Sequence, residues 1–420
     1  MSSNARYTQA FVWIWLPRAT EPVVAGKLSA VGANLLFNYG KSYLERGDAL
    51  ALYDAELPLQ PGIHPLLSGL NMPGCIRDAA PDAWGRRVVI NRVLGLKGAK
   101  ASSTAPLDEL TYLLESGSDR IGALDFQHSA TDYVPRSPVN ASLAELLGSA
   151  ERVEKGVLLT PELDQALYHG SSIGGARPKA LIETNAKKYI AKFSSSSDLY
   201  SIVKAEFIAM RLASLVGLQV AHVELTRASG RDVLLVERFD RVYSPQGWQR
   251  KAMLSALTLL GLDEMMARYA SYEALAEIIR HRFGNPSATL RELFSRLVFN
   301  ILCGNTDDHA RNHAAFWEGD RLTLTPAYDI CPQNRTGNEA TQAMLISGDN
   351  RMSQLSSCLE AAHHFLLSRE EARAIIKQQM SVIKESWSSV CDLAELGETD
   401  RLLLWRRQFL NPFAEEGFVE

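Results

Sequence analysis

Two polar segments in the C-terminal half of the chain combine acidic and amide side chains in a set order. Asp307 is followed five residues later by Asn312, and Asp329 closes a predicted strand over residues 322–329. Mg²⁺ is bound through few carboxylates together with substrate phosphates. Phosphoryl transfer also needs a carboxylate that positions the attacking hydroxyl, and kinases use an Asp, an Asn after four intervening residues, and a later Asp. The segments therefore predict phosphoryl-transfer chemistry, with two oxygen ligands for a metal ion and one separate carboxylate.

Two other interpretations apply to the first of these segments. His309 and His313 have the spacing of zinc ligands, but the metalloprotease pattern requires Glu after the first His, where this chain has Ala310. A third zinc ligand is not evident either, which disfavours zinc. The second interpretation is a turn between helices that Asp307 or Asp308 caps. It accounts for one carboxylate and leaves the rest of the ordered set unexplained.

A run of small residues, Gly170 to Gly175, precedes the sequence Ala-Arg-Pro-Lys at 176–179. Small side chains let backbone N–H groups approach an anion closely, which is typical of a phosphate-binding loop. The run is not a Walker A loop, because Ala176 and Arg177 stand where Lys and then Ser or Thr would follow Gly175. An ordinary surface turn is the alternative.

Lys192 lies in an apolar predicted strand over residues 188–193. An amine with apolar neighbours requires a carboxylate or phosphate partner, although a lysine on an edge strand can also extend its amine to solvent. The candidate partner is Glu206, on an apolar stripe of a predicted helix over residues 200–216. A glutamate at the solvent flank of that helix is the alternative.

The sequence from Leu234 to Arg241 is an apolar strand that leads into a charged turn. Such a segment fits a hinge whose backbone groups face a ligand. A plain strand that ends in surface charges is the alternative.

The elements that must position these residues change in character along the chain. Residues 1–127 are rich in short extended runs and turn residues, and residues 128–140 lose periodicity. The glycine-rich loop, Lys192 and the hinge follow within residues 128–245. From residue 246 to 420 the pattern is helical, because apolar residues recur at intervals of three and four. We therefore predict an α+β fold in which a β-rich N-terminal lobe, with its own subdomain at 1–127, is joined to an all-helical C-terminal lobe.

The composition is that of a globular protein. Of the 420 residues, 46% are hydrophobic and 22% are charged, and the formal net charge is −4. That balance disfavours a chain that binds nucleic acid over its whole surface. The longest apolar run near the start, residues 10–16, is too short to cross a bilayer and predicts a buried strand. Five widely spaced cysteines predict reduced, mainly buried thiols in a cytoplasmic protein without a membrane partner.

Four stretches of the chain resemble the HipA-like serine/threonine kinases, the toxin components of bacterial type II toxin–antitoxin pairs. These stretches are Ser172–Lys179, Val236–Arg241, Thr306–Asn312 and Leu324–Asp329. In addition, Gly26–Tyr53 looks like the family's small β domain, and Pro81-Asp82-Ala83-Trp84-Gly85-Arg86 looks like its Leu-Pro-Asp-x-Trp-Gly turn. The resemblance covers nearly the full chain and implies a bilobal protein-kinase-like fold.

The resemblance implies a role for each motif residue. Asp307 would be the catalytic base, and Asn312 and Asp329 would hold Mg²⁺. Lys192, with Glu206 as its helix carboxylate, would contact the phosphates of ATP. The other nucleotide-binding residues that the resemblance implies are Ser172, Gly174, Gly175, Ala176, Lys179, Glu237, Phe239, His309 and Tyr328.

In this family the loop serine, here Ser172, can be autophosphorylated, which ejects the loop and switches the kinase off. Nearly two negative charges where the ATP phosphates bind give a physical reason for that switch. Ser171 is a second candidate phosphosite. Four residues depart from the family pattern: Arg177-Pro178 replaces a Gln-Glu that some members carry, Asp308 a common Gly, and Ala327 a common bulky residue. These departures remove no catalytic group. They leave open the question whether phosphorylation ejects the loop as in other family members.

The resemblance also implies a biological role. It predicts an ATP- and Mg²⁺-dependent kinase that inhibits growth by phosphorylating a translation component, such as an aminoacyl-tRNA synthetase. A helix-turn-helix antitoxin would neutralise it and supply the contact with DNA. Two alternatives stand beside this prediction. A catalytically silent, kinase-like binding module would need none of Lys192, Asp307 and Asn312, and a small-molecule kinase would use the same residues.

Overall fold

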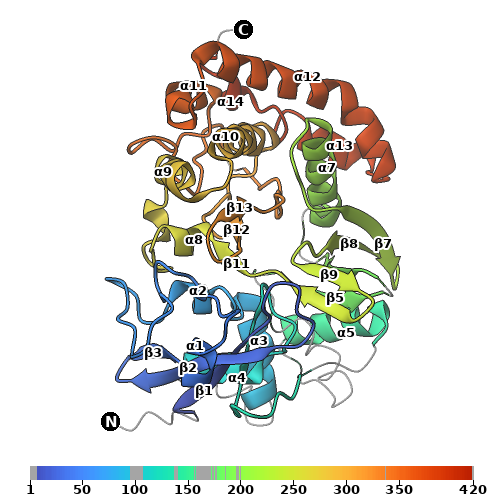
Figure 1. The fold of residues 1–420 in the computed structure, drawn as a ribbon. Coiled ribbons are helices and arrows are strands. Elements are labelled where there is room, and N and C mark those ends of the chain that lie inside the picture. The colour runs from blue at the N-terminus through green and yellow to red at the C-terminus, as the bar shows by residue number, and fades with distance from the viewer. Residues whose placement is uncertain are drawn as a thin grey trace. The chain divides into compact units, whose positions relative to one another are not determined.

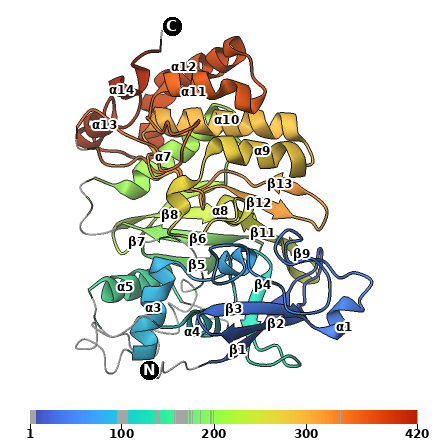
Figure 2. The same ribbon diagram turned by 90° about the vertical axis from the view of Figure 1, so that its left-hand side faces the viewer.

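The computed structural model describes residues 7–94, 107–136, 141–155, 157, 172, 175, 177–184, 186–194, 198, 200–335 and 337–418. The chain forms two compact units, which appear in Figures 1 and 2. The first unit consists of Met1–Phe193, Arg227–Leu254 and Trp317–Gly319, and the second of Ser194–Thr226, Ser255–Phe316 and Asp320–Glu420.

The N-terminal part of the first unit contains an antiparallel sheet with the strand order β3-β2-β1-β4. Buried and more exposed residues alternate along β3, as expected where one face of a strand meets a core. The predicted strand over residues 10–16 corresponds to β1. The four strands are β1 (Gln9–Ile14), β2 (Val23–Val31), β3 (Asn34–Tyr39) and β4 (Leu124–Gln127).

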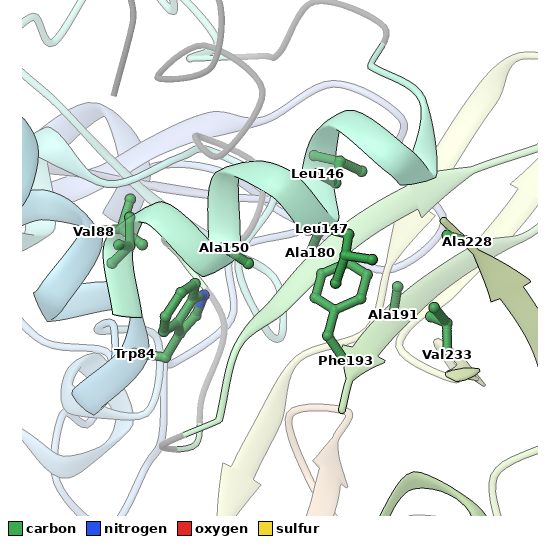
Figure 3. Packing of buried hydrophobic residues seen from close by; sticks show 11 residues of the cluster. Trp84, Val88, Leu146, Leu147, Ala150, Ala180, Ala191, Phe193, Ala228 and Val233 are labelled. Carbon is green, nitrogen blue, oxygen red and sulfur yellow. The ribbon is translucent and has the colours of Figure 1, made fainter. Parts of the chain in front are cut away.

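A second sheet has the strand order β5-β6-β8-β7 and carries the predicted lysine strand in its interior. Figure 3 shows one face of this sheet, where Ala180, Ala191 and Phe193 lie against α5, with Trp84 at the same cluster. The strands are β5 (Lys179–Glu183), β6 (Lys188–Phe193), β8 (Arg231–Glu237) and β7 (Val223–Ala228), and the chain passes between the units within β7.

Helices and a hairpin complete the first unit. Helix α5 (Leu143–Glu154) begins with a reciprocal capping box, in which Ser142 and Glu145 satisfy each other's backbone N–H groups. The remaining elements are α1 (Lys41–Leu44), α2 (Gly74–Arg77), α3 (Ala83–Leu94), α4 (Glu109–Glu115), β9 (Arg241–Ser244) and β10 (Gly247–Arg250).

The second unit is built around α10 (Pro286–Cys303), which packs against α9, α11 and α12. Asn285 caps the start of α10 by accepting a hydrogen bond from the Ala288 N–H, and Pro286 is tolerated in the first turn. The helix ends at Gly304, as predicted, in the left-handed conformation with φ of 72°. A Cβ atom at Gly304 would lie 2.7 Å from the carbonyl oxygen of Gln408, so the position admits only glycine.

Figure 1 shows α9, α11 and α12 beside α10 and the other helices of the second unit farther from it. The predicted helix over residues 200–216 is α7, and it packs on α12. These helices are α7 (Ile202–Leu215), α8 (Ala256–Leu259), α9 (Tyr272–Arg282), α11 (Leu355–Ala361), α12 (Arg369–Leu393), α13 (Glu398–Leu404) and α14 (Pro412–Glu415), with 3₁₀ turns at Ala267–Tyr269 and Ala362–Phe365.

The C-terminal part is mainly helical, as predicted, but it is not all-helical. A small sheet with the order β11-β12-β13 is formed by β11 (Met253–Ser255), β12 (Ala314–Trp317) and β13 (Leu322–Leu324). The predicted strand over residues 322–329 was therefore too long. Pro326 has no N–H group to donate to a neighbouring strand, which explains why the strand ends before it and why Asp329 lies in a loop.

The five cysteines are all within the described residues and form no disulfide. Four are buried and Cys331 is half-buried, as predicted for structural thiols. In the part of the chain that the structure describes, no helix has the length and apolar character needed to cross a membrane.

Candidate active site

The loop that follows α10 brings Asp307 and Asn312 together. The backbone carbonyl of Asp307 accepts hydrogen bonds from the His309 N–H at 2.9 Å and from Asn312 Nδ2 at 3.2 Å. The Asn312 N–H in turn donates to the His309 carbonyl at 2.8 Å. No helix begins at Asp307 or Asp308, so the interpretation of this segment as a helix cap is wrong. The loop is a compact turn that leads into β12.

A buried polar triad, Tyr272, Asp308 and His313, fixes both ends of this loop. His313 Nε2 lies 2.9 Å from one carboxylate oxygen of Asp308, and the Tyr272 hydroxyl donates a hydrogen bond to the other. Burial alone would raise the pKa of Asp308, but the contacts with His313 and Tyr272 hold it below its usual value. Because Asp308 follows Asp307 and His313 follows Asn312, the triad positions the predicted catalytic base and one predicted metal ligand.

Asp329 lies beside the same loop. Its backbone has φ of 58°, a left-handed conformation that asparagine and aspartate adopt more readily than most residues. The preceding Tyr328 donates its hydroxyl to the Arg311 carbonyl at 2.7 Å. Partial burial raises the pKa of Asp307, and the charges of Asp329 and Asp308 raise it further against the opposing effect of His309. The carboxylates of Asp307 and Asp329 are thus close enough to interact.

The residues fit a magnesium ion better than zinc. Asn312 uses its Nδ2 group to hold the Asp307 carbonyl, which leaves Oδ1 as the acceptor that can face a cation. One amide oxygen and the carboxylate of Asp329 match the small, hard donor set of Mg²⁺. Among the described residues, no group of three His, Cys, Asp or Glu side chains is arranged around a common metal position. His313 binds Asp308 through Nε2, so the zinc interpretation finds no support.

The first unit carries a pair of lysines on one face of its second sheet. Lys179 of β5 lies directly opposite Lys192 of β6 in the antiparallel register, and Ala180 lies opposite Ala191. Since the two alanines face α5, the two lysines share the other face. Like charges at directly opposed positions favour an anion between them. Lys192 is on an interior strand, so the interpretation as an edge-strand lysine is wrong.

The glycine-rich loop is described at Ser172, Gly175 and from Arg177 onward. Ser172 is 1% exposed and donates its hydroxyl to the Asp119 carbonyl at 3.2 Å, so it does not belong to an ordinary surface turn. Gly175 has φ of +96°, and a Cβ atom there would lie 2.2 Å from the Lys179 Nζ atom. The backbone of Gly175 and the amine of Lys179 are therefore in close contact. The predicted residues Ser171, Gly174 and Ala176 lie outside the described residues.

The predicted hinge ends in buried charges and not in surface charges. Arg238 contacts the carboxylates of Asp240 at 2.8 Å and Asp119 at 3.0 Å, and Arg241 contacts Asp119 at 2.8 Å. These guanidinium groups outweigh the effect of burial and lower the pKa of Asp240 to about 2. The Arg238 N–H also donates to the Lys188 carbonyl at 2.8 Å. The cluster fixes the backbone that runs from Glu237 to Phe239.

The remaining predicted residues occupy varied settings. Glu206 is 4% exposed on α7, so it is not a glutamate at a solvent flank. It belongs to the second unit and Lys192 to the first, and their pairing remains a prediction. Glu237 accepts a hydrogen bond from the Lys187 amine at 2.7 Å, and Phe239 is half-buried. His309 is half-buried and donates its N–H to the Asp307 carbonyl.

Two known domain types match this chain. The HipA-like C-terminal domain matches residues 171–387, which is more than half of the chain, and the HipA N-terminal domain matches residues 19–127. The chain belongs to the HipA-like family. The segments Ser172–Lys179, Val236–Arg241 and Thr306–Asn312 all lie within the residues that match the C-terminal domain.

Individual HipA proteins are related to this chain at modest identity. The serine/threonine-protein kinase toxin HipA of Shewanella oneidensis is 27% identical over 186 residues, which cover 38% of this chain and 42% of that protein. The aligned part thus spans less than half of that relative. A solved structure of the Shewanella oneidensis HipA, HipB and operator DNA complex matches 97% of this chain and 96% of the solved chain, with a TM-score of 0.67 and 20% identity. It shows the same fold, the predicted α+β bilobal architecture.

Several residues that shape the site were not predicted as functional from the sequence. Tyr272 and Asp119 are far from the motifs along the chain, and no local pattern marks them. Its spacing from His309 marks His313 only as a candidate zinc ligand, and its position directly after Asn312 is the signal for a role in the loop. The charges at Arg238 and Asp240 follow an apolar strand, and that abrupt change was the available sign of a buried ion cluster.

Proposed function

We propose that this HipA-family protein is an ATP- and Mg²⁺-dependent serine/threonine protein kinase that acts as a growth-inhibiting toxin. The observation that carries the proposal is the loop in which Asn312 is tied to the Asp307 backbone, with the Asp329 carboxylate near Asp307. Positioned carboxylate and amide oxygens are what phosphoryl transfer requires of the protein. A scaffold that binds without turnover would need no such arrangement.

In the proposed reaction, Asp307 aligns the hydroxyl of the substrate side chain. As the hydroxyl oxygen attacks the γ-phosphorus, its proton passes to the Asp307 carboxylate, and the bond to the bridging oxygen of ADP breaks. A pKa raised by partial burial and by Asp329 makes this carboxylate a better proton acceptor than an ordinary aspartate. Asn312 and Asp329 would hold Mg²⁺, which neutralises phosphate charge when bound.

The first unit would bind the nucleotide. Lys179 and Lys192, opposed on one sheet face, would neutralise phosphate oxygens that carry several negative charges. The backbone from Glu237 to Phe239, held by the buried cluster around Arg238, would meet the adenine. This division assigns phosphate binding to the first unit and the catalytic base to the second.

Autophosphorylation of the loop belongs to the same proposal. Ser172 is buried and hydrogen-bonded to the Asp119 carbonyl, so its hydroxyl has to leave this position before it can accept a phosphoryl group. Its phosphate would not fit back into a site closed to solvent without desolvating almost two charges. A modified Ser172 would therefore hold the loop away from the position described here. Ser171 remains the second candidate.

The proposed partners follow from the family. A helix-turn-helix antitoxin would neutralise the kinase and supply the DNA contact, as the net charge of −4 favours. The related Shewanella oneidensis HipA was solved together with HipB and its operator DNA, which supports this proposal. The proposed protein substrate is a translation component such as an aminoacyl-tRNA synthetase.

Intact-mass analysis after incubation with ATP and Mg²⁺ tests the activity. The parent protein is expected to gain phosphate at Ser172 or Ser171, and Asp307→Ala is expected to gain none. If the starting mass shows that the protein already carries phosphate, a phosphatase removes that phosphate before the incubation. An unmodified parent protein that gains no phosphate and transfers none to proteins of a lysate would contradict a kinase and favour the binding module. ATP turnover without any phosphorylated protein would favour a small-molecule kinase.

A further inference from the structure

The turn at the start of α3 contacts the glycine-rich loop at Gly175, where it binds both the N–H and the carbonyl of the glycine backbone. Asp82 Oδ2 accepts a hydrogen bond from the Gly175 N–H at 2.8 Å. The Trp84 N–H donates to the Gly175 carbonyl at 3.1 Å. The donor is one of the first N–H groups of α3, which have no partner inside the helix. Through these two bonds, the Gly175 N–H, the Gly175 carbonyl and the Trp84 N–H all have hydrogen-bond partners.

A third hydrogen bond ties the same turn to β5. The Trp84 indole Nε1 donates to the Lys179 carbonyl at 3.1 Å, only four residues beyond Gly175. Trp84 is fully buried, and Figure 3 shows its ring beside α5 near Val88 and Ala150. A large side chain packed in this way cannot move without opening the core. The turn is therefore a rigid support for the loop.

Gly175 is also constrained from the side of Lys179. Its φ of +96° is a conformation that side chains disfavour, and the Lys179 amine occupies the space that a Cβ atom would need. The amine therefore lies against the Gly175 backbone, which the turn binds on its other groups. Lys179 lies opposite Lys192 on the sheet, so the turn is coupled to both lysines of the proposed phosphate site.

We propose that Asp82 and Trp84 form a latch that holds the backbone at Gly175 and Lys179 in the arrangement that binds ATP phosphates. Asp82 and Trp84 are positioning residues, since they act through Gly175 and Lys179 and have no contact with the reacting atoms. The N-terminal part of the chain would thereby contribute directly to nucleotide affinity. The kinetic consequence rests on the proposed kinase function, whereas the latch itself does not.

Asp82→Ala tests the latch because it removes the acceptor for the Gly175 N–H. Asp82→Asn keeps an acceptor oxygen at the same position and serves as the rescue variant. Asp48→Ala is the matched control, because Asp48 is an exposed aspartate of the same unit whose carboxylate pairs with Arg46. If Asp82→Ala does not fold, Asp82→Ser, with a side chain too short to make the same contact, replaces it.

Hydrogen exchange of a peptide that includes the Gly175 amide is measured first, without nucleotide. Loss of a hydrogen bond to a carboxylate is expected to speed exchange of this amide about tenfold in Asp82→Ala. Exchange in Asp82→Asn and Asp48→Ala is expected to match the parent protein. Unchanged exchange in Asp82→Ala would overturn the latch, whatever the enzyme activity.

Steady-state kinetics with ATP is the second measurement. The KM for ATP is expected to rise about tenfold in Asp82→Ala while kcat stays within about twofold, because the variant loses positioning of the phosphates and no catalytic group. Faster exchange with an unchanged KM would overturn the role in nucleotide binding. A parent protein without ATP turnover would refute the proposed kinase function and this kinetic role with it, and the exchange data would still decide whether the latch exists.

Discussion

The lysine pair of the first unit and the catalytic loop of the second are positioned by different means. Lys179 and Lys192 are placed by the register of two antiparallel strands, a regular backbone pattern. Asp307 and Asn312 are placed by side-chain contacts, above all by Tyr272, which lies 36 positions from Asp308 along the sequence. The register of a backbone ladder depends little on any single side chain. Positions set by a buried polar network depend on every member of it.

The difference suggests a division of labour that mutation can test. The strand-held lysines suit the binding of a charged group, which tolerates some movement of a flexible amine. The network-held loop suits chemistry, in which small displacements of a carboxylate are costly. Variants of the two regions should therefore affect different quantities.

The largest effect is expected at the catalytic loop itself. Asp307→Asn keeps the size of the side chain but cannot accept the substrate proton, so kcat should fall about 10³-fold. Phosphate transfer is measured in a discontinuous assay with ATP and Mg²⁺, with Asp320→Asn, an exposed aspartate of the same unit, as the control. A loss of less than about tenfold would mean that another group takes the proton.

A second large effect is expected at the buried ion cluster of Arg238, Asp119 and Asp240, which adjoins the hinge. Arg238→Met leaves Asp119 and Asp240 with fewer partners, and should lower the free energy of unfolding by about 3 kcal/mol. Arg227→Met, which affects an arginine paired with Asp232 at the surface, is the control. Urea unfolding measures the free energy of unfolding of both variants. Equal stability of the two variants would show that the hinge backbone does not need the cluster.

The same cluster predicts an acid limit of stability. In the folded state the pKa of Asp240 is about 2, below its usual value of 3.8, so folding favours the ionised carboxylate. This contribution is fully present above about pH 4 and is lost as the pH falls through the folded value. It amounts to about 2 kcal/mol. Urea unfolding should show that the free energy of unfolding declines as the pH is lowered from about 5 to about 2.5. The decline should be smaller in Asp240→Asn.

The smallest of these effects is expected in the triad. Tyr272→Phe removes one of the two donors to the Asp308 carboxylate, and His313 remains, so the free energy of unfolding should fall by about 1.5 kcal/mol. The matched control is Tyr269→Phe, at an exposed tyrosine of the same unit. A drop in kcat should accompany the loss of stability, because the triad holds the loop. Loss of stability with full activity would limit the triad to a structural role.

In both regions the sequence predicted local elements and did not predict the contacts between distant residues. The strand at 188–193, the helix near Glu206 and the end of α10 at Gly304 follow from periodicity and turn residues, which are local signals. The strand predicted to reach Asp329 ends at Leu324, because Pro326 has no N–H group to donate to a neighbouring strand. The Tyr272 triad and the Asp82 contact with Gly175 could not be predicted, because they join residues far apart in sequence whose proximity only the tertiary fold creates.

A parallel ATP titration of Lys192→Ala and Asp307→Asn tests the account most directly. Calorimetry with ATP and Mg²⁺ is expected to show binding to Lys192→Ala weakened about 10- to 100-fold, because a charged contact to phosphate is lost. Asp307→Asn is expected to bind ATP as the parent protein does while it transfers phosphate about 10³-fold more slowly. The opposite pattern, with normal binding in Lys192→Ala and lost binding in Asp307→Asn, would contradict the assignment of phosphate binding to the strand-held lysines and of chemistry to the loop.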